Sequence, residues 1–130
     1  MSTLALLLTA LLFGGMTLYS FGFAAVLFAV YGTDDARSGI RNTFPHYYLW
    51  VIGTAAVTGA VAYPVSTLAA WLLIGIALST AYARQMLMLQ INAATDSGNA
   101  GRFKMLHGVS VVIQLVQIGM AGWALALIAS

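Results

Sequence analysis

The sequence predicts an all-α membrane protein, a four-transmembrane-helix antiparallel bundle in up-down order. The first observation is composition, because 62% of the 130 residues are hydrophobic and only 6% are charged. Soluble domains carry about 25% charged residues, so most of this surface must face lipid. The second is that the apolar runs reach the roughly 20 residues a spanning helix needs. They are also continuous, whereas the strands of a membrane barrel alternate apolar and polar residues.

Turn signals divide the chain into four expected helices within one membrane domain, residues 1–130. Gly32–Asn42 and Asn92–Gly101 are polar and rich in turn residues, and Pro64 interrupts the chain after Tyr63. Pro45 is expected in the first turn of the second helix, where its missing N–H costs nothing. The expected helices cover residues 3–31, 44–62, 66–91 and 102–129.

The charged residues gather at one end of this arrangement. Four crossings place both termini on one side of the membrane and both charged loops on the other. Basic residues mark the cytoplasmic side, and here they are Arg37, Arg41, Arg84, Arg102 and Lys104. We therefore expect cytoplasmic loops and non-cytoplasmic termini in a bacterial inner membrane. Aromatic belts should lie at both interfaces, the charged one holding Tyr31, Tyr47, Tyr48 and Trp50.

The fourth helix carries a polar stripe. Polar residues follow one another at spacings of three and four positions, which places them on one helical face: His107, Ser110, Gln114 and Gln117. Lipid offers no hydrogen bonds, so this face should point into the bundle. Two interpretations stay open. One is interhelical hydrogen bonding to hydroxyls such as Ser20, and the other is a hydrated path or small-ligand pocket.

Depth counting places three ionisable residues in one layer at the charged edge of the hydrocarbon: His46, Arg84 and His107. No acidic residue lies inside the spans to pair with Arg84. Its guanidinium either reaches the headgroups or binds an anion such as a lipid headgroup or carboxylate. His46 and His107 are the candidate ligands of haem b or a metal ion, although no Cys or carboxylate accompanies them.

The sequence lacks the residues that several classes of function require. The chain has no cysteine, which excludes thiol catalysis, thiolate metal sites and covalent haem attachment. The spans hold neither paired carboxylates nor a Ser-His-Asp set, so no enzymatic activity is expected. A formal charge of +2 is too small to indicate nucleic-acid binding.

Three short motifs carry a family resemblance. They are a Phe-Pro-x-Tyr helix start, an Ala-Arg helix end and a Phe-x-x-x-His-Gly-x-Ser helix start, and they fall on Phe44, Pro45 and Tyr47, on Ala83 and Arg84, and on Phe103, His107, Gly108 and Ser110. Over about residues 15–127 the chain resembles the transmembrane-protein-205-like family, bacterial tetraspan proteins of unknown function that are distantly similar to copper-resistance-D-like membrane proteins. The resemblance implies a four-helix membrane fold and a shared role for Arg84 and His107, but no activity.

We therefore expect a small non-enzymatic integral membrane protein, either accessory or ligand-binding. Its polar site should lie near the cytoplasmic interface and include Arg84, His107, Ser110, Gln114 and Gln117. One alternative is a haem b- or metal-binding redox protein, and another is a structural subunit of a larger membrane complex. The expected partners are the lipid bilayer, an anionic lipid, and a second copy or a larger complex.

Overall fold

A computed structural model describes residues 2–130, and within this range the chain is helical apart from its turns. Two of the four continuous helices contain a short π-helical turn. In chain order the helices are α1 (Ser2–Thr17), the first π-helical turn (Leu18–Phe23) and α2 (Ala24–Val30); α3 (Thr33–Ala62); α4 (Thr67–Tyr82), the second π-helical turn (Ala83–Leu87) and α5 (Met88–Asp96); and α6 (Ala100–Ala129).

Three of these helices are long and apolar enough to cross a membrane: Ser2–Val30, Thr67–Asp96 and Ala100–Ala129. The remaining helix, α3, is less apolar, since its first turns hold charged residues and its later turns hold Tyr, Thr and Gly. The all-helical membrane character expected from the sequence is confirmed. A membrane crossing by α3 stays a prediction.

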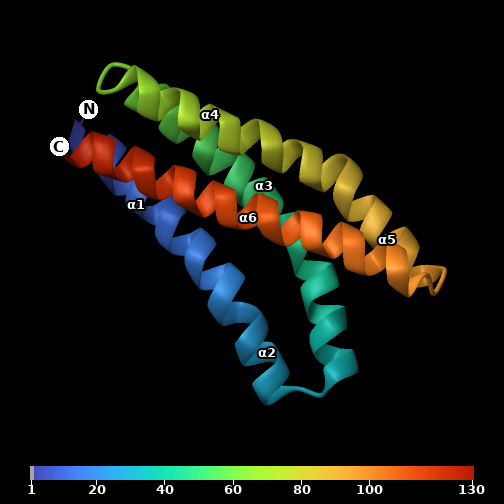
Figure 1. The fold of residues 1–130 in the computed structure, drawn as a ribbon. Coiled ribbons are helices and arrows are strands. Elements are labelled where there is room, and N and C mark those ends of the chain that lie inside the picture. Colours follow the sequence, from blue (N-terminus) through green and yellow to red (C-terminus); the bar gives the residue numbers. More distant parts are fainter. Residues whose placement is uncertain (1) are drawn as a thin grey trace.

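The helices pack in up-down order (Figure 1). Each helix contacts its neighbours in sequence, and α6 closes the ring by packing on both α4 and α1. The two chain ends lie together with the α3–α4 turn, while the α2–α3 and α5–α6 turns lie at the opposite end. The polar connections therefore share one end of the molecule, as the sequence predicts.

The second helix starts much earlier than expected. Residues 32–42 were predicted to be a polar loop, yet α3 begins at Thr33, and Pro45 lies inside the helix rather than in its first turn. Asp34 and Asp35 occupy the first turn, where negative charge is favoured by the helix dipole. The charged residues of this segment therefore extend the second helix instead of forming a loop before it. The second predicted loop likewise shrinks to residues 97–99.

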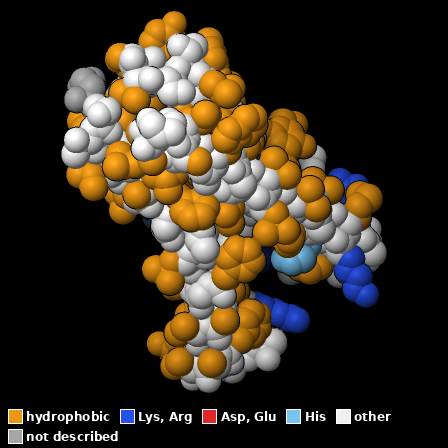
Figure 2. Space-filling view, turned by 60° about the vertical axis from the view of Figure 1, so that its left-hand side comes forward, with side chains coloured by type: hydrophobic (Ala, Val, Ile, Leu, Met, Phe, Trp, Pro, Cys, Tyr) orange, Lys and Arg blue, Asp and Glu red, His pale blue; other side chains and the backbone are white. Residues whose placement is uncertain are grey.

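The bundle is closely packed at the end that holds the termini and spreads apart at the charged end. α1 buries four residues, whereas no residue of the first π-helical turn or of α2 is buried. Figure 1 shows α2 diverging from α6 toward the charged end. In Figure 2 the Lys and Arg side chains lie on the diverging parts, away from the broad hydrophobic region. The first helix therefore leaves the core near Thr17.

Candidate functional site

The polar stripe of α6 points into the bundle from Ser110 onward. Ser110 and Gln117 are buried, Gln114 is half-buried, and His107 is exposed. Beyond Gln117 the same face continues with the buried residues Ala121 and Ala124. The inward face of α6 is thus polar toward the charged end and apolar toward the C-terminus. Whether these residues bind a ligand stays a prediction.

Gln117 links the fourth helix to the third. Its Nε2 atom donates to the Ser79 hydroxyl at 2.7 Å and to the Thr80 hydroxyl at 3.0 Å. Both hydroxyls use their own hydrogen on backbone carbonyls of α4, Ser79 on Gly75 at 2.8 Å and Thr80 on Ile76 at 2.7 Å. They can therefore only accept from Gln117. The sequence suggested hydroxyls such as Ser20 of the first helix as partners for the stripe, whereas Gln117 bonds to the third helix.

Gln114 belongs to a different and weaker set of contacts. Its Oε1 atom accepts from Ser20 at 3.3 Å, and its Nε2 atom donates to Ser110 at 3.5 Å. These lengths lie beyond the usual range of hydrogen bonds between such groups. The Tyr48 hydroxyl, reaching across from α3, lies close to both Ser110 and Gln114. The Ser20 contact was anticipated from the sequence.

Three tyrosines complete this set, and sequence reasoning missed all of them. Tyr47 and Tyr48 were expected in a lipid-facing belt, but they are only 8% and 5% exposed. Tyr19 stacks on Tyr47 with ring centroids 3.9 Å apart, and the Tyr47 hydroxyl lies close to Ser20. Within residues 2–130 the buried Tyr19 hydroxyl has no hydrogen-bond partner. Nothing in the sequence around these tyrosines distinguishes a side chain in an interfacial aromatic belt from one buried in the core.

We call the residues Tyr19, Ser20, Tyr47, Tyr48, Ser110 and Gln114 the hydroxyl cluster. Its members come from the first, second and fourth helices and converge just inside the charged end. Each phenol and hydroxyl of the cluster carries one O–H donor and acceptor lone pairs, and the Gln114 amide carries two N–H donors and one acceptor oxygen. Such a set can exchange hydrogen bonds with a polar group on a ligand.

Arg84 lies in the second π-helical turn and is half-buried against α3. Its Nε atom is 3.4 Å from the Pro45 carbonyl oxygen, and its Nη1 atom is 3.3 Å from the Gln85 side-chain oxygen. Within residues 2–130 the ion pairs include no contact to Arg84. The guanidinium therefore keeps donors free for another group.

The two histidines do not gather with Arg84. His107 is exposed and stacks on Phe103 of its own helix, with ring centroids 5.6 Å apart. His46 is also exposed, on α3. The described residues contain no group of three or more His, Cys, Asp or Glu side chains placed to hold a metal ion. Arg84 contacts Pro45 of α3 and its own neighbour Gln85, so the structure does not join Arg84 and His107 in one contact.

One ion pair links α3 to α5 at the charged end. The Arg41 guanidinium forms a bidentate contact with the Asp96 carboxylate, at 2.8 and 2.9 Å. Arg41 precedes the expected spanning part of its helix, and Asp96 follows the expected spanning part of its own. The hydrogen bond lowers the pKa of Asp96 and raises the pKa of Arg41. Both side chains are largely exposed, so screening by water keeps the pair weak.

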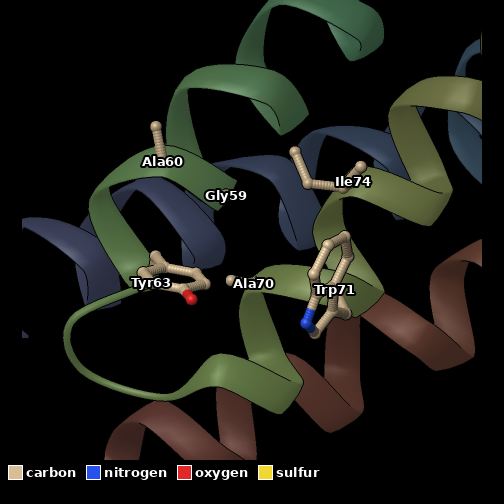
Figure 3. Close-up of a pocket in the computed structure, with 6 residues that line it drawn as sticks. All are labelled: Gly59, Ala60, Tyr63, Ala70, Trp71 and Ile74. Carbon is tan, nitrogen blue, oxygen red and sulfur yellow. The ribbon is translucent and has the colours of Figure 1, made fainter.

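Two open grooves mark the outer surface. The first, of about 340 Å³, lies between α3 and α4 near the terminal end, and Figure 3 shows Tyr63 and Trp71 on either side of Ala70. The second, also of about 340 Å³, lies between the first helix and α3, and it is lined by Gly15, Leu18, Tyr19, Phe23, Thr43, Tyr47 and Trp50. Both are almost wholly apolar. The second shares Tyr19 and Tyr47 with the hydroxyl cluster.

Comparison with known proteins gives a family without an activity. The sequence profile of a domain of unknown function, DUF4149, matches residues 7–100. This range includes both π-helical turns and Arg84, whereas the polar stripe of α6 lies beyond it. No curated protein and no solved structure matches the chain. Because the match covers well over half of the residues, the chain belongs to the DUF4149 family, a domain of unknown function.

Proposed function

We propose that this protein is a non-enzymatic accessory protein of the membrane that binds an anionic group at its charged end. The observation that carries the proposal is the state of Arg84. Among residues 2–130 its half-buried guanidinium has only two long contacts, to Pro45 and Gln85, and neither partner is charged. A cation at the edge of the hydrocarbon is costly unless it meets an opposite charge or reaches the headgroups.

The contrast with Arg41 supports this interpretation. The planar guanidinium of Arg41 is occupied by the Asp96 carboxylate, through two bonds of 2.8 and 2.9 Å. Arg84 presents the same planar fork in a less exposed place, without a carboxylate to fill it. Phosphate and carboxylate groups match that fork with two parallel hydrogen bonds. An anionic lipid headgroup is the ligand that a membrane supplies at this depth.

The proposal includes the orientation expected from the sequence. The charged end would face the cytoplasm of a bacterial cell, because basic loops are retained there and the inner leaflet carries anionic lipid. Arg102 and Lys104 lie in the first turns of α6, at the same end of the bundle. They would add attraction for an anion. The likeness to the transmembrane-protein-205-like family stays a prediction and names no ligand.

The test compares variants that remove one positive charge from the same end. Arg84→Gln, Arg84→Lys and the matched control Arg37→Gln would be purified in mild detergent, and bound phosphatidylglycerol would be measured by native mass spectrometry. We expect Arg84→Gln to lose the bound lipid, Arg84→Lys to keep part of it, and Arg37→Gln to keep it all. Equal retention by Arg84→Gln and the unaltered protein would refute the proposal.

Two alternatives from the sequence stay predictions, and the same preparation addresses them. A haem b or metal protein should show a visible absorption band or a stoichiometric metal, lost on substitution of His46 or His107. A structural subunit should co-purify with other chains or form a defined homo-oligomer. A colourless, metal-free protein of monomeric mass that retains phosphatidylglycerol would support anion binding over both.

A further inference from the structure

Three of the four helices contain a break in their α-helical hydrogen bonding. The first π-helical turn, Leu18–Phe23, interrupts the first helix, and the second, Ala83–Leu87, interrupts the third. In the second turn the Met88 N–H bonds to the Ala83 carbonyl oxygen, one residue farther back than in an α-helix. Pro45 breaks the ladder of the second helix, because its nitrogen carries no hydrogen to donate. Prolines and π-helical turns are the usual places where helices bend.

Side-chain contacts bring these three breaks to one level of the bundle. Tyr19, in the first π-helical turn, stacks on Tyr47 with ring centroids 3.9 Å apart and lies edge-on to Phe44 at 5.3 Å. Arg84, in the second π-helical turn, directs its Nε atom to the Pro45 carbonyl oxygen at 3.4 Å. Both turns therefore lie beside the same part of α3. The fourth helix, α6, passes this level as one unbroken α-helix.

Beyond the breaks, residues 24–44 form a hairpin of α2 and the start of α3. Its two arms pack on each other, with Leu27 beside Gly39. From residue 18 to residue 46 only Ala36 is buried, whereas α3 is buried repeatedly after that point. Within residues 2–130 the hairpin's side-chain hydrogen bonds to other helices are those of Arg41 to Asp96. The hairpin is therefore a unit of its own, joined to the bundle by few contacts.

A hollow separates this hairpin from the end of the bundle that α5 and α6 form. Figure 2 shows it between the lower and the right-hand projections, with Lys or Arg side chains on both and no acidic side chain beside it in this view. Arg37 of the hairpin and Arg102 and Lys104 of α6 form no ion pair within residues 2–130. Arg84 lies at the root of the hairpin, through its contact with Pro45. An anion held there would attract basic side chains on both walls of the hollow.

We propose that the α2–α3 hairpin is a hinged lid that closes over the anion held by Arg84, an inference that rests on the function proposed above. Arg84 couples binding to the hinge, since a phosphate group would engage the guanidinium that now contacts the Pro45 carbonyl oxygen. Because Arg41 holds the α3 side of the lid to α5, closure moves the free α2 side toward α6. Tyr19 and Tyr47 stay stacked, since both lie on the bundle side of the lid.

The test measures the width of the hollow in the full-length protein. Spin labels at Ala29 of α2 and Met105 of α6, both exposed, would report the distance across it. The control pair, at Ala10 of α1 and Ala126 of α6, lies in the closely packed half and is also exposed. Nanodiscs of phosphatidylcholine alone would be compared with nanodiscs containing phosphatidylglycerol, and with phosphatidylcholine nanodiscs given inorganic phosphate. We expect at least one anion to shorten the distance across the hollow and to leave the control pair unchanged.

Two variants separate the hinge from the anion site. Arg84→Gln should lose the shift, because the anion no longer has its guanidinium. Pro45→Ala restores the missing backbone donor and keeps the carbonyl oxygen that Arg84 contacts. Its shift should therefore be smaller than that of the unaltered protein when the two are compared at equal phosphatidylglycerol occupancy, measured by native mass spectrometry.

The outcomes keep the lid and the anion site apart. Retained phosphatidylglycerol with no shortening by either anion would overturn the lid and leave the anion site in place. An equal shift in Arg84→Gln would overturn the coupling through Arg84, and an equal shift in Pro45→Ala would overturn the hinge. If the unaltered protein retains no phosphatidylglycerol, the proposed function fails and the lid fails with it.

Discussion

The Nε2 atom of Gln117 donates a 2.7 Å hydrogen bond to the hydroxyl of Ser79, which joins the fourth helix to the third near the middle of the bundle. The Ser79 hydroxyl in turn donates to the Gly75 carbonyl oxygen at 2.8 Å. The pair is therefore oriented by the backbone of α4. It fixes the rotation of α6 about its axis, which decides what the rest of the polar stripe faces.

Replacing Gln117 with Leu should destabilise the protein by about 1 kcal/mol, since two interhelical bonds of about 0.6 kcal/mol each are lost. The measurement is the free energy of unfolding in detergent, and Gln90→Leu, at a half-buried position of α5, serves as the control. A double-mutant cycle with Ser79→Ala should show coupling. Additive losses would mean that the bond does not contribute.

Enlarging Gly15 should destabilise the packing of the first helix on α3. A Cβ atom added at Gly15 would overlap the Trp50 ring, whereas one added at the neighbouring Gly14 would meet nothing within 4 Å. Gly15→Ala should therefore cost about 1–3 kcal/mol, as overpacking usually does, and lower the thermal midpoint. Gly14→Ala is the matched control and should leave the midpoint unchanged or slightly higher. Equal midpoints for the two variants would contradict this packing.

The ion pair of Arg41 and Asp96 should respond to acid. Because the pKa of Asp96 is lowered in the folded state, the pair stabilises the protein above the ordinary carboxyl pKa and loses its effect as pH falls below about 4. Spin labels at Ser38 and Ser97 would report the distance between the start of α3 and the end of α5. We expect a broader distance distribution in acid, at high salt and in Asp96→Asn. An unchanged distribution in Asp96→Asn would exclude the pair as the link between α3 and α5.

Single cysteines should report the sidedness of the molecule, and the chain lends itself to this because it has none. Cysteines at Ser38 and Ser97 would lie at the charged end, and cysteines at Ser2 and Ser130 at the other. In intact bacterial cells an impermeant maleimide should label Ser2→Cys and Ser130→Cys alone. Inverted vesicles should give the opposite pattern. Labelling of Ser38→Cys in intact cells would reverse the proposed orientation.

Part of the candidate site could be predicted from the sequence. The spacing of Ser110, Gln114 and Gln117 placed them on one face, and the need for partners in lipid turned that face inward. His107 follows the same spacing but is exposed, because α6 stands clear of α2 at the charged end. Periodicity gives a face of one helix, but it does not say how far along that helix a neighbour remains in contact.

The sequence by itself determined that most of the surface faces lipid and that the chain forms four helices. Continuous apolar runs in lipid must satisfy their backbone hydrogen bonds within each helix. Only the tertiary structure decided which groups meet. Tyr47 and Tyr48 are adjacent and could have faced lipid, yet both are buried, while Gln117 found its partners on the third helix. The physical reason is that the packing or hydrogen-bond partner of a side chain depends on how whole helices are rotated and how far they diverge. Side chains scattered along the chain set those angles together, and no local pattern records them.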